Sequence, residues 1–177
     1  MCIRDRSYSL KYVKVCLLFL ASTLAPQWLN ANESISLREF VALIPNWEVP
    51  PNSYHTIVGD GGYAFGLYQL HEIMVEDYNR ITGKKVSHAV AFDPAFSSHI
   101  AYTILAYYKA HMEAQGVTPV VDHFLFIWNG GGNAWKRVDN PIDDQKQKNL
   151  ERYRDRAMLI INQYIYEQKR RQPKERA

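Results

Sequence analysis

The amino-acid sequence predicts a mainly α-helical protein with one small extended region. Apolar residues recur at helical spacing in several segments that begin at capping residues and end at glycine. Only GYAFGLYQL, residues 62–70, has the composition of a strand or a β-hairpin. A chain of 177 residues, 47% of them hydrophobic and 22% charged, can bury one core and is too apolar to be disordered. We therefore expect a single helical domain.

Residues 1–31 are predicted to be a leader that is removed on export. The first six residues, MCIRDR, resemble a translated sequencing adapter, and Lys11 and Lys14 precede the apolar run Val15–Leu24. Ten residues are too few to span a bilayer, so the pattern favours a signal peptide and a mature form without a membrane span. A buried first helix is the alternative.

The end of the leader also decides the cysteine content of the mature protein. Cleavage is expected after Ala31 or nearer Ala25, and both cysteines, Cys2 and Cys16, precede these positions. A mature form without cysteine has no disulfide, so its fold must be stable through packing alone.

The first helix after the leader has a clear start and an irregular end. Ser36 is an N-cap candidate, and Glu39 three residues later completes a capping box. Pro45 lies inside the apolar pattern and is expected to kink this helix or to displace its last turn. Residues 49–60 contain two consecutive prolines and read as a loop.

The next two helices follow the usual rules for helix ends. HEIMVEDYNRIT is predicted to be helical and to stop at Gly83, where a C-terminal glycine is favourable. A longer helix is expected to have Asp93 as its N-cap, Pro94 at its first position and Gly116 as its stop.

Two further helices complete the domain, which is predicted to cover residues 32–169. TPVVDHFLFIWNGGG is expected to begin at Thr118 and Pro119 and to end at its glycines, and the last helix runs from about Lys148 to Lys169. Residues 170–177 are a basic tail. We expect this tail to be solvated, with attachment to an anionic polymer or membrane surface as the alternative.

The glycine-rich stretch GDGGYAFGLYQL lacks the spacing of a phosphate-binding loop, and no lysine follows its glycines. HEIMV has Val75 where a zinc-binding H-E-x-x-H motif needs its second histidine, and the six histidines show no paired ligand spacing. With a net charge of only +3, no nucleic-acid partner is expected either. The sequence therefore predicts no nucleotide, metal or other cofactor.

A pair of carboxylates is the remaining candidate for chemistry. Glu48 ends the first helix beside Trp47 and Phe40, a setting that can raise the pKa of Glu48 and keep it protonated. Asp60 lies twelve residues later, beyond the loop. Cleavage of a glycosidic bond uses two carboxyl groups in unlike environments. A surface glutamate and a turn aspartate are the alternative interpretation of the same spacing.

FVALIPNWE, GDGGYAFGLYQLHEIMVEDYNRITGKK, FDP and IWNGG, in this order, resemble the lysozyme-like superfamily, in particular bacterial lytic transglycosylase domains. The resemblance covers residues 37–153, roughly two thirds of the chain. It implies a lysozyme-like fold, in which a helical bundle and a small β-hairpin region line a saccharide cleft. By position, it also implies that Glu48 is the catalytic acid.

Further site residues follow from the same resemblance. The G-L-x-Q segment, which lines the cleft in the family, is matched by Gly66, Tyr68 and Gln69. The W-N-G-G segment is matched by Trp128 and Asn129. Tyr153 matches a tyrosine that a late helix supplies to the acid. The glycines of GDGGYAFGLYQL would let the backbone approach a sugar chain. Aromatic faces for sugar rings are expected from Tyr54, Tyr63, Phe65, Tyr68 and Trp128.

Asp60 leaves two enzyme activities open. GDGGYAFGLYQL also resembles goose-type lysozymes, in which the aspartate of the G-D-x-G motif helps to activate water; their next acidic position is His71 in this chain. A hydrolase would use Asp60 in this way. A transglycosylase would need only Glu48, because the sugar's own 6-hydroxyl replaces water.

The leader and the resemblance together predict an exported, monomeric, cofactor-free enzyme that is periplasmic or extracellular after the leader is removed. It would cleave the β-1,4 bond between N-acetylmuramic acid and N-acetylglucosamine in the glycan strands of peptidoglycan. Glu48 is followed by VPP where the family usually has Ser-Gly. A peptidoglycan-binding domain without activity is therefore the alternative, and an adaptor of secretion machinery, suggested by the basic tail, is a third possibility.

Overall fold

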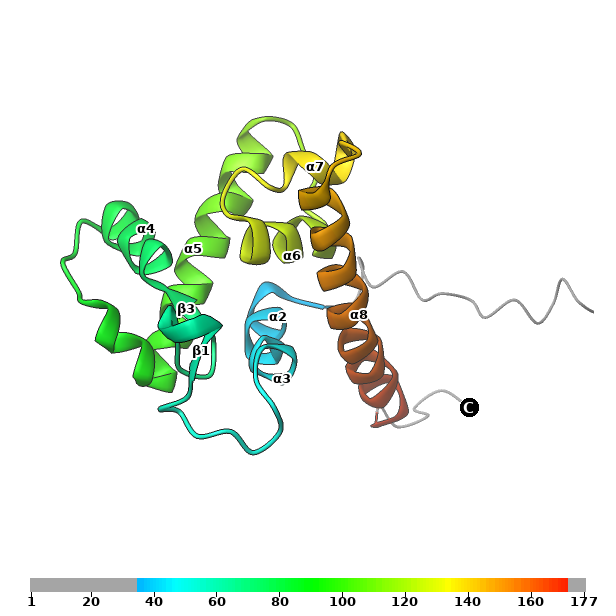
Figure 1. The fold of residues 1–177 in the computed structure, drawn as a ribbon. Helices are drawn as coiled ribbons and strands as arrows, with labels where there is room; N and C mark the ends of the chain where they lie inside the picture. Colours follow the sequence, from blue (N-terminus) through cyan, green and yellow to red (C-terminus); the bar gives the residue numbers. More distant parts are fainter. Residues whose placement is uncertain (1–34, 172–177) are drawn as a thin grey trace, which may run out of the picture. The chain divides into compact units, whose positions relative to one another are not determined.

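The computed structural model describes residues 35–171, and these are mainly helical with one small antiparallel sheet (Figure 1). This confirms the mainly α prediction. The predicted leader with both cysteines lies outside the described residues, as does the basic tail after its first two residues. Within residues 35–171, no helix combines the length and the apolar character that crossing a membrane requires.

Pro45 divides the first predicted helix into two, as expected. Helix α2 (Leu37–Leu43) starts with the predicted capping box: the Ser36 hydroxyl accepts from the Glu39 N–H at 3.2 Å, and the Glu39 carboxylate accepts from the Ser36 N–H at 2.8 Å. Helix α3 (Pro45–Glu48) is a single turn with proline at its first position. Glu48 is its last residue, and the chain then becomes extended.

The extended region is a three-stranded antiparallel sheet in the order β1-β2-β3. Its strands are short: β1 (Val58–Gly59), β2 (Ala64–Phe65) and β3 (Leu70–His71), with the 3₁₀ turn η2 (Asp60–Gly62) between the first two. Phe65 lies opposite Val58 on one side and Leu70 on the other. The sheet thus begins before GYAFGLYQL and ends one residue after it.

Helices α4 (Glu72–Thr82) and α5 (Pro94–Ala114) have the predicted ends. Gly83 follows α4 with φ of 70°, the left-handed conformation that ends many helices. The Asp93 carboxylate accepts hydrogen bonds from the N–H groups of Ala95 and Phe96 at the start of α5. A 3₁₀ segment, η3 (His88–Phe92), connects the two helices.

Helix α6 (Val121–Gly130) starts later than predicted. The expected cap at Thr118 is wrong, because the helix follows Val120, whose N–H donates to Nδ1 of His123 at 3.0 Å. Helix α7 (Lys136–Asp139) was not expected. Helix α8 (Gln145–Arg171) extends beyond both ends of its predicted range.

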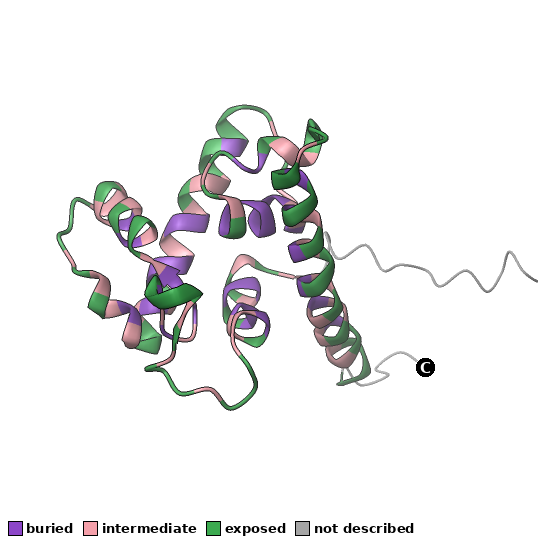
Figure 2. Ribbon diagram, viewed as in Figure 1, coloured by how far each residue is buried: buried purple, intermediate pink, exposed green. Residues whose placement is uncertain are grey.

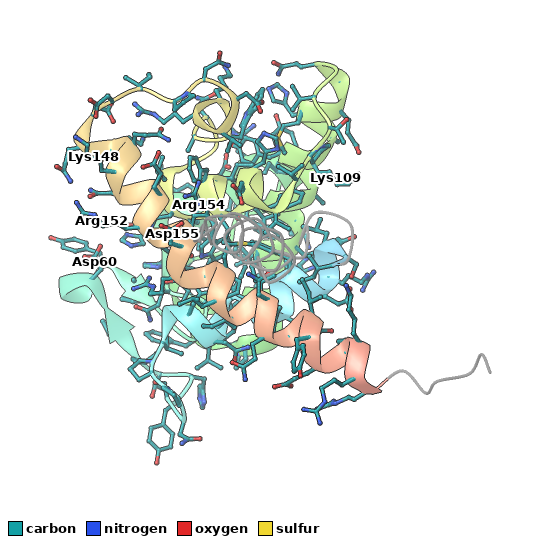
Figure 3. All side chains as sticks on the ribbon, turned by 90° about the vertical axis from the view of Figure 1, so that its right-hand side faces the viewer. Asp60, Lys109, Lys148, Arg152, Arg154 and Asp155 are labelled. Atoms are coloured by element: carbon teal, nitrogen blue, oxygen red, sulfur yellow. The ribbon has the colours of Figure 1, made fainter. Side chains whose placement is uncertain are left out.

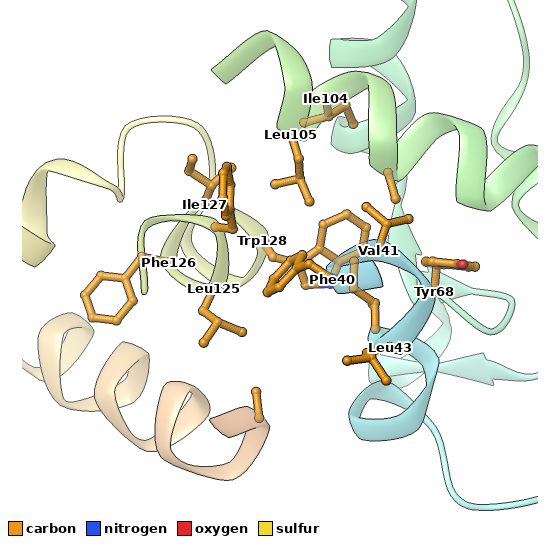
Figure 4. Packing of buried hydrophobic residues seen from close by; sticks show 14 of the residues in the cluster. Phe40, Val41, Leu43, Tyr68, Ile104, Leu105, Leu125, Phe126, Ile127 and Trp128 are labelled. Atoms are coloured by element: carbon orange, nitrogen blue, oxygen red, sulfur yellow. The ribbon is translucent and has the colours of Figure 1, made fainter. Parts of the chain in front are cut away.

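The core is centred on α6, which packs against α8 on one side and α5 on another. Most of α6 is buried, as Figure 2 shows. Trp128 is one of its buried residues. In Figure 4 its apolar side chains meet those of α2 and α5. The Phe40 ring lies 5.7 Å, centroid to centroid, from both Trp47 and Phe124. This packing fixes the helix end that carries Glu48.

Candidate active site

Three helices converge on the carboxyl group of Glu48. Its Oε1 accepts a hydrogen bond from Nε1 of Trp128 on α6 at 3.0 Å and another from the hydroxyl of Tyr153 on α8. Glu48 itself comes from the end of α3. The structure therefore brings together three of the predicted site residues, from positions as far as 105 residues apart in the sequence.

Tyr153 connects Glu48 to the core. Its hydroxyl oxygen accepts a hydrogen bond from Nε1 of Trp47 at 2.7 Å. An indole N–H can only donate, so the hydroxyl proton is free to go to Glu48. Burial, and then the charge of Glu48, raise the pKa of Tyr153 well above its ordinary value. Tyr153 therefore remains a protonated donor.

The environment raises the pKa of Glu48 above its ordinary value of 4.5. Burial is the largest cause, because it disfavours the charged form. The hydrogen bonds from Tyr153 and Trp128 act in the opposite direction, as do the charge of Arg156 and that of a protonated His71. The predicted direction of the shift is confirmed. Glu48 thus retains its proton to a higher pH than an exposed glutamate.

Two pockets share His71. The larger, of about 610 Å³, lies along α4 and the end of α6 and is lined by, among others, His71, Ile73, Asp77, Tyr108, Trp128 and Asn129. The smaller, of about 390 Å³, is lined by residues of the sheet region that include Asp60, Tyr63, Phe65, His71 and Ile73. Trp128, the donor to Glu48, connects the carboxyl group to the larger pocket.

Asp60 is held quite differently from Glu48. Its side chain is 70% exposed, and Figure 3 places it at the margin of the view. The Oδ2 atom lies 3.3 Å from Nε2 of His71. The sequence marked His71 only as a departure from an acidic position. In the structure, His71 touches Asp60, lines both pockets and acts electrostatically on Glu48.

Gly66 and Gln69 have structural roles within the sheet region. Gly66 has φ of 72°, and a Cβ there would lie 1.9 Å from the carbonyl oxygen of Ala91. On the side where a Cβ would stand, this glycine therefore admits the protein's own backbone, and its approach to a sugar chain stays a prediction. Nε2 of Gln69 donates to the Gly66 carbonyl at 2.8 Å, and its amide packs against Gly59.

The other predicted contact residues separate into buried and exposed ones. Tyr68 is only 6% exposed and belongs to the core, as Figure 4 shows. Asn129 is exposed and lines the larger pocket. Tyr54 and Tyr63 are 81% and 71% exposed, whereas Phe65 stacks on His88 with 4.0 Å between ring centroids.

The far side of the larger pocket contains a cluster that the sequence did not reveal. The Tyr108 hydroxyl donates to Oδ2 of Asp77 at 3.0 Å, and Arg80 pairs with Oδ1 of the same carboxylate at 2.5 Å. A Cβ on Gly132 would lie 1.9 Å from the Tyr108 hydroxyl. The Asp77–Arg80 spacing is visible in the sequence, but the approach of Tyr108 and Gly132 is tertiary.

Within residues 35–171, no three His, Cys, Asp or Glu side chains gather as a metal site would require. The site described above therefore consists of a carboxyl group, its donors, a histidine–aspartate contact and two pockets. Comparison of the chain with family models, with curated proteins and with solved structures found no match.

Proposed function

We propose that this chain is an exported lysozyme-like enzyme, a lytic transglycosylase or a muramidase, with peptidoglycan glycan strands as its substrate. The bond cleaved is the β-1,4 bond between N-acetylmuramic acid and N-acetylglucosamine. One observation carries the proposal. A half-buried carboxyl group with a raised pKa, fixed by two donors on a single oxygen, is connected through Trp128 to a pocket of about 610 Å³.

Glu48 acts first as a general acid. It gives its proton to the glycosidic oxygen while the bond from that oxygen to the anomeric carbon breaks. The carboxylate that forms gains most from the hydrogen bonds of Tyr153 and Trp128, since donors interact more strongly with a charged acceptor. Both donors are in place beforehand and need no rearrangement.

Glu48 then acts as a base. In a transglycosylase its carboxylate takes the proton of the sugar's 6-hydroxyl, whose oxygen bonds to the anomeric carbon. In a muramidase the proton comes from water instead. Either route returns Glu48 to its protonated form. The larger pocket is the proposed saccharide cleft, with the Asn129 amide available for hydrogen bonds to the sugar.

The test is digestion of purified, insoluble peptidoglycan by the protein and by its Glu48→Gln variant. The glutamine accepts the same hydrogen bonds but has no acidic proton, so the rate of muropeptide release should fall about 10²- to 10⁴-fold. Glu113→Gln is the matched control, because Glu113 is exposed on α5 and lines neither pocket described above.

Release by Glu48→Gln at the rate of the unsubstituted protein would refute the assignment of Glu48. If the unsubstituted protein sediments with peptidoglycan yet releases no soluble product over a long digestion, it is the binding domain without turnover. The mass of the released ends separates the two enzymes, since 1,6-anhydro ends are one water lighter than hydrolysed ends.

A further inference from the structure

His71 lies where the sheet passes into α4, and it faces two pockets at once. It is the last residue of β3, and its backbone is still extended, with φ of −79° and ψ of 156°. Its side chain is 41% exposed and lines the larger pocket together with Trp128 and the smaller one together with Asp60. A water molecule can therefore reach the imidazole ring.

Asp60 gives this imidazole a defined orientation. Oδ2 of Asp60 is 3.3 Å from Nε2 of His71, which favours the tautomer with its proton on Nε2. The lone pair then lies on Nδ1. Asp60 itself is set by the turn: it has φ of 46°, and its carbonyl oxygen accepts the N–H of Tyr63 at 3.2 Å. An imidazole oriented by a carboxylate is a recurrent general base in enzymes.

We propose that His71, oriented by Asp60, is the catalytic base that activates water for the reaction in which Glu48 is the acid, and that the protein is therefore a hydrolase. This inference rests on the proposed function and decides between its two forms. In the hydrolase, His71 then takes the role of base toward water that Glu48 would otherwise have. It gives Asp60 the role of a positioning residue that acts through His71.

Water gives a proton to Nδ1 of His71, and its oxygen bonds to the anomeric carbon while the bond to the glycosidic oxygen breaks. That oxygen takes the proton of Glu48. His71 then releases its proton to solvent and Glu48 takes one up, so the net change is addition of one water. The titratable groups that line the two pockets beside His71 are Asp60, Tyr63, Glu72, Glu76, Asp77, Arg80, His88 and Tyr108.

The first measurement is the mass of the ends that the unsubstituted full chain releases from purified peptidoglycan. Hydrolysed ends, one water heavier than 1,6-anhydro ends, are expected. If the ends are 1,6-anhydro, the base assignment is overturned, while the proposed role of Glu48 stands as long as Glu48→Gln is inactive. A wild-type protein that releases nothing overturns both proposals.

The second measurement compares variants at saturating substrate. His71→Gln should lower kcat about 10²- to 10⁴-fold with little change in KM, because only proton transfer is removed. Asp60→Asn should also lower kcat at unchanged KM, though less, since the imidazole remains. His111→Gln is the matched control, because His111 is exposed on α5 and lines neither pocket.

Chemical rescue separates a base from a structural residue. In His71→Ala, added imidazole should restore part of the rate of hydrolysis, and the same imidazole should leave Glu48→Gln inactive. The thermal midpoint of each variant shows whether it is folded. A folded His71→Ala variant with the wild-type rate, or one that imidazole does not rescue, overturns the proposal.

Discussion

Glu48 and Asp60 are two carboxylates twelve residues apart, and the folded chain treats them in opposite ways. Glu48 belongs to a closed half of the site, formed with Trp128 and Tyr153, where burial raises its pKa. Asp60 belongs to an open half, formed with His71, where its side chain is 70% exposed. The difference teaches that one short stretch of sequence can supply two unlike carboxyl environments when only one end is covered by helices.

The largest expected effect is a loss of unfolding free energy on substitution of a glycine in the sheet region. It tests whether the whole open half of the site is weakly packed. Gly66→Ala should lower the free energy of unfolding by about 3 kcal/mol, because the new Cβ would lie 1.9 Å from the Ala91 carbonyl oxygen and φ is positive. Gly61 has a similar φ of 62° but no atom within 4 Å of such a Cβ, so Gly61→Ala should cost only about 1 kcal/mol.

Urea unfolding of both variants measures this difference. Equal losses would mean that Ala91 moves away easily, and that the sheet region is as loosely held as the exposure of Asp60 suggests.

The second effect concerns the closed half. Tyr153→Phe removes the hydroxyl that accepts from Trp47 and donates to Glu48, so it should cost about 1–3 kcal/mol of unfolding free energy by leaving a buried N–H unpaired. Tyr164 is on the same helix as Tyr153, and its hydroxyl donates to Glu39 of α2 at 3.0 Å. Tyr164→Phe should cost less unfolding free energy than Tyr153→Phe, because Tyr164 is not buried.

Tyr153→Phe also has a consequence for pH dependence. The Tyr153 hydrogen bond lowers the pKa of Glu48, so its loss should raise that pKa further. The proposed acid would stay protonated to higher pH. The alkaline limb of the variant's pH–activity profile should therefore lie at higher pH than that of the wild-type protein. A limb that stays in place or moves downward would contradict the role of Glu48 as the acid.

A third effect follows from the pKa of Glu48 itself. Since the folded value lies above the ordinary 4.5, the stability from this group is present below about that pH and is lost as pH rises through the folded pKa. Glu48→Gln should therefore gain in thermal midpoint relative to the wild-type protein between acidic and neutral pH. Parallel midpoints of the two proteins across that range would show that burial does not penalise the carboxylate.

The smallest effect belongs to the open half. Asp60→Asn and Tyr63→Ala should each change the free energy of unfolding by less than about 0.5 kcal/mol, because both side chains are exposed. Urea titration of the two variants measures it. A loss as large as that of Tyr153→Phe would mean that the two halves do not differ in how they are held.

Local signals in the sequence predicted the helix ends well. Ser36, Glu39, Gly83 and Asp93 act where the pattern places them, because capping depends on neighbours within three or four residues. The prediction that Thr118 caps α6 was wrong, because the helix starts after Val120, whose N–H donates to His123 in the first turn of α6. That contact depends on where the helix is packed, which local composition does not encode.

The site was predictable in part. Glu48, Trp128 and Tyr153 were chosen by resemblance, and the structure brings them into direct contact. The role of His71 was not predictable, since its contact with Asp60 requires β3 to return beside the turn after β1. The packing of Gly66 against the Ala91 backbone is also a tertiary contact that local composition does not encode.

The hydroxyl of Tyr153 serves two adjacent residues, Trp47 and Glu48, that are made more than 100 residues earlier during synthesis. A nascent chain therefore carries its carboxyl group for most of translation without the group that orients it. Any product that ends before α8 lacks the hydroxyl that donates to Glu48 and accepts from Trp47, and has Trp128 as the remaining described donor to Glu48. Assembly of this part of the site therefore has to wait until α8 has been made as far as Tyr153.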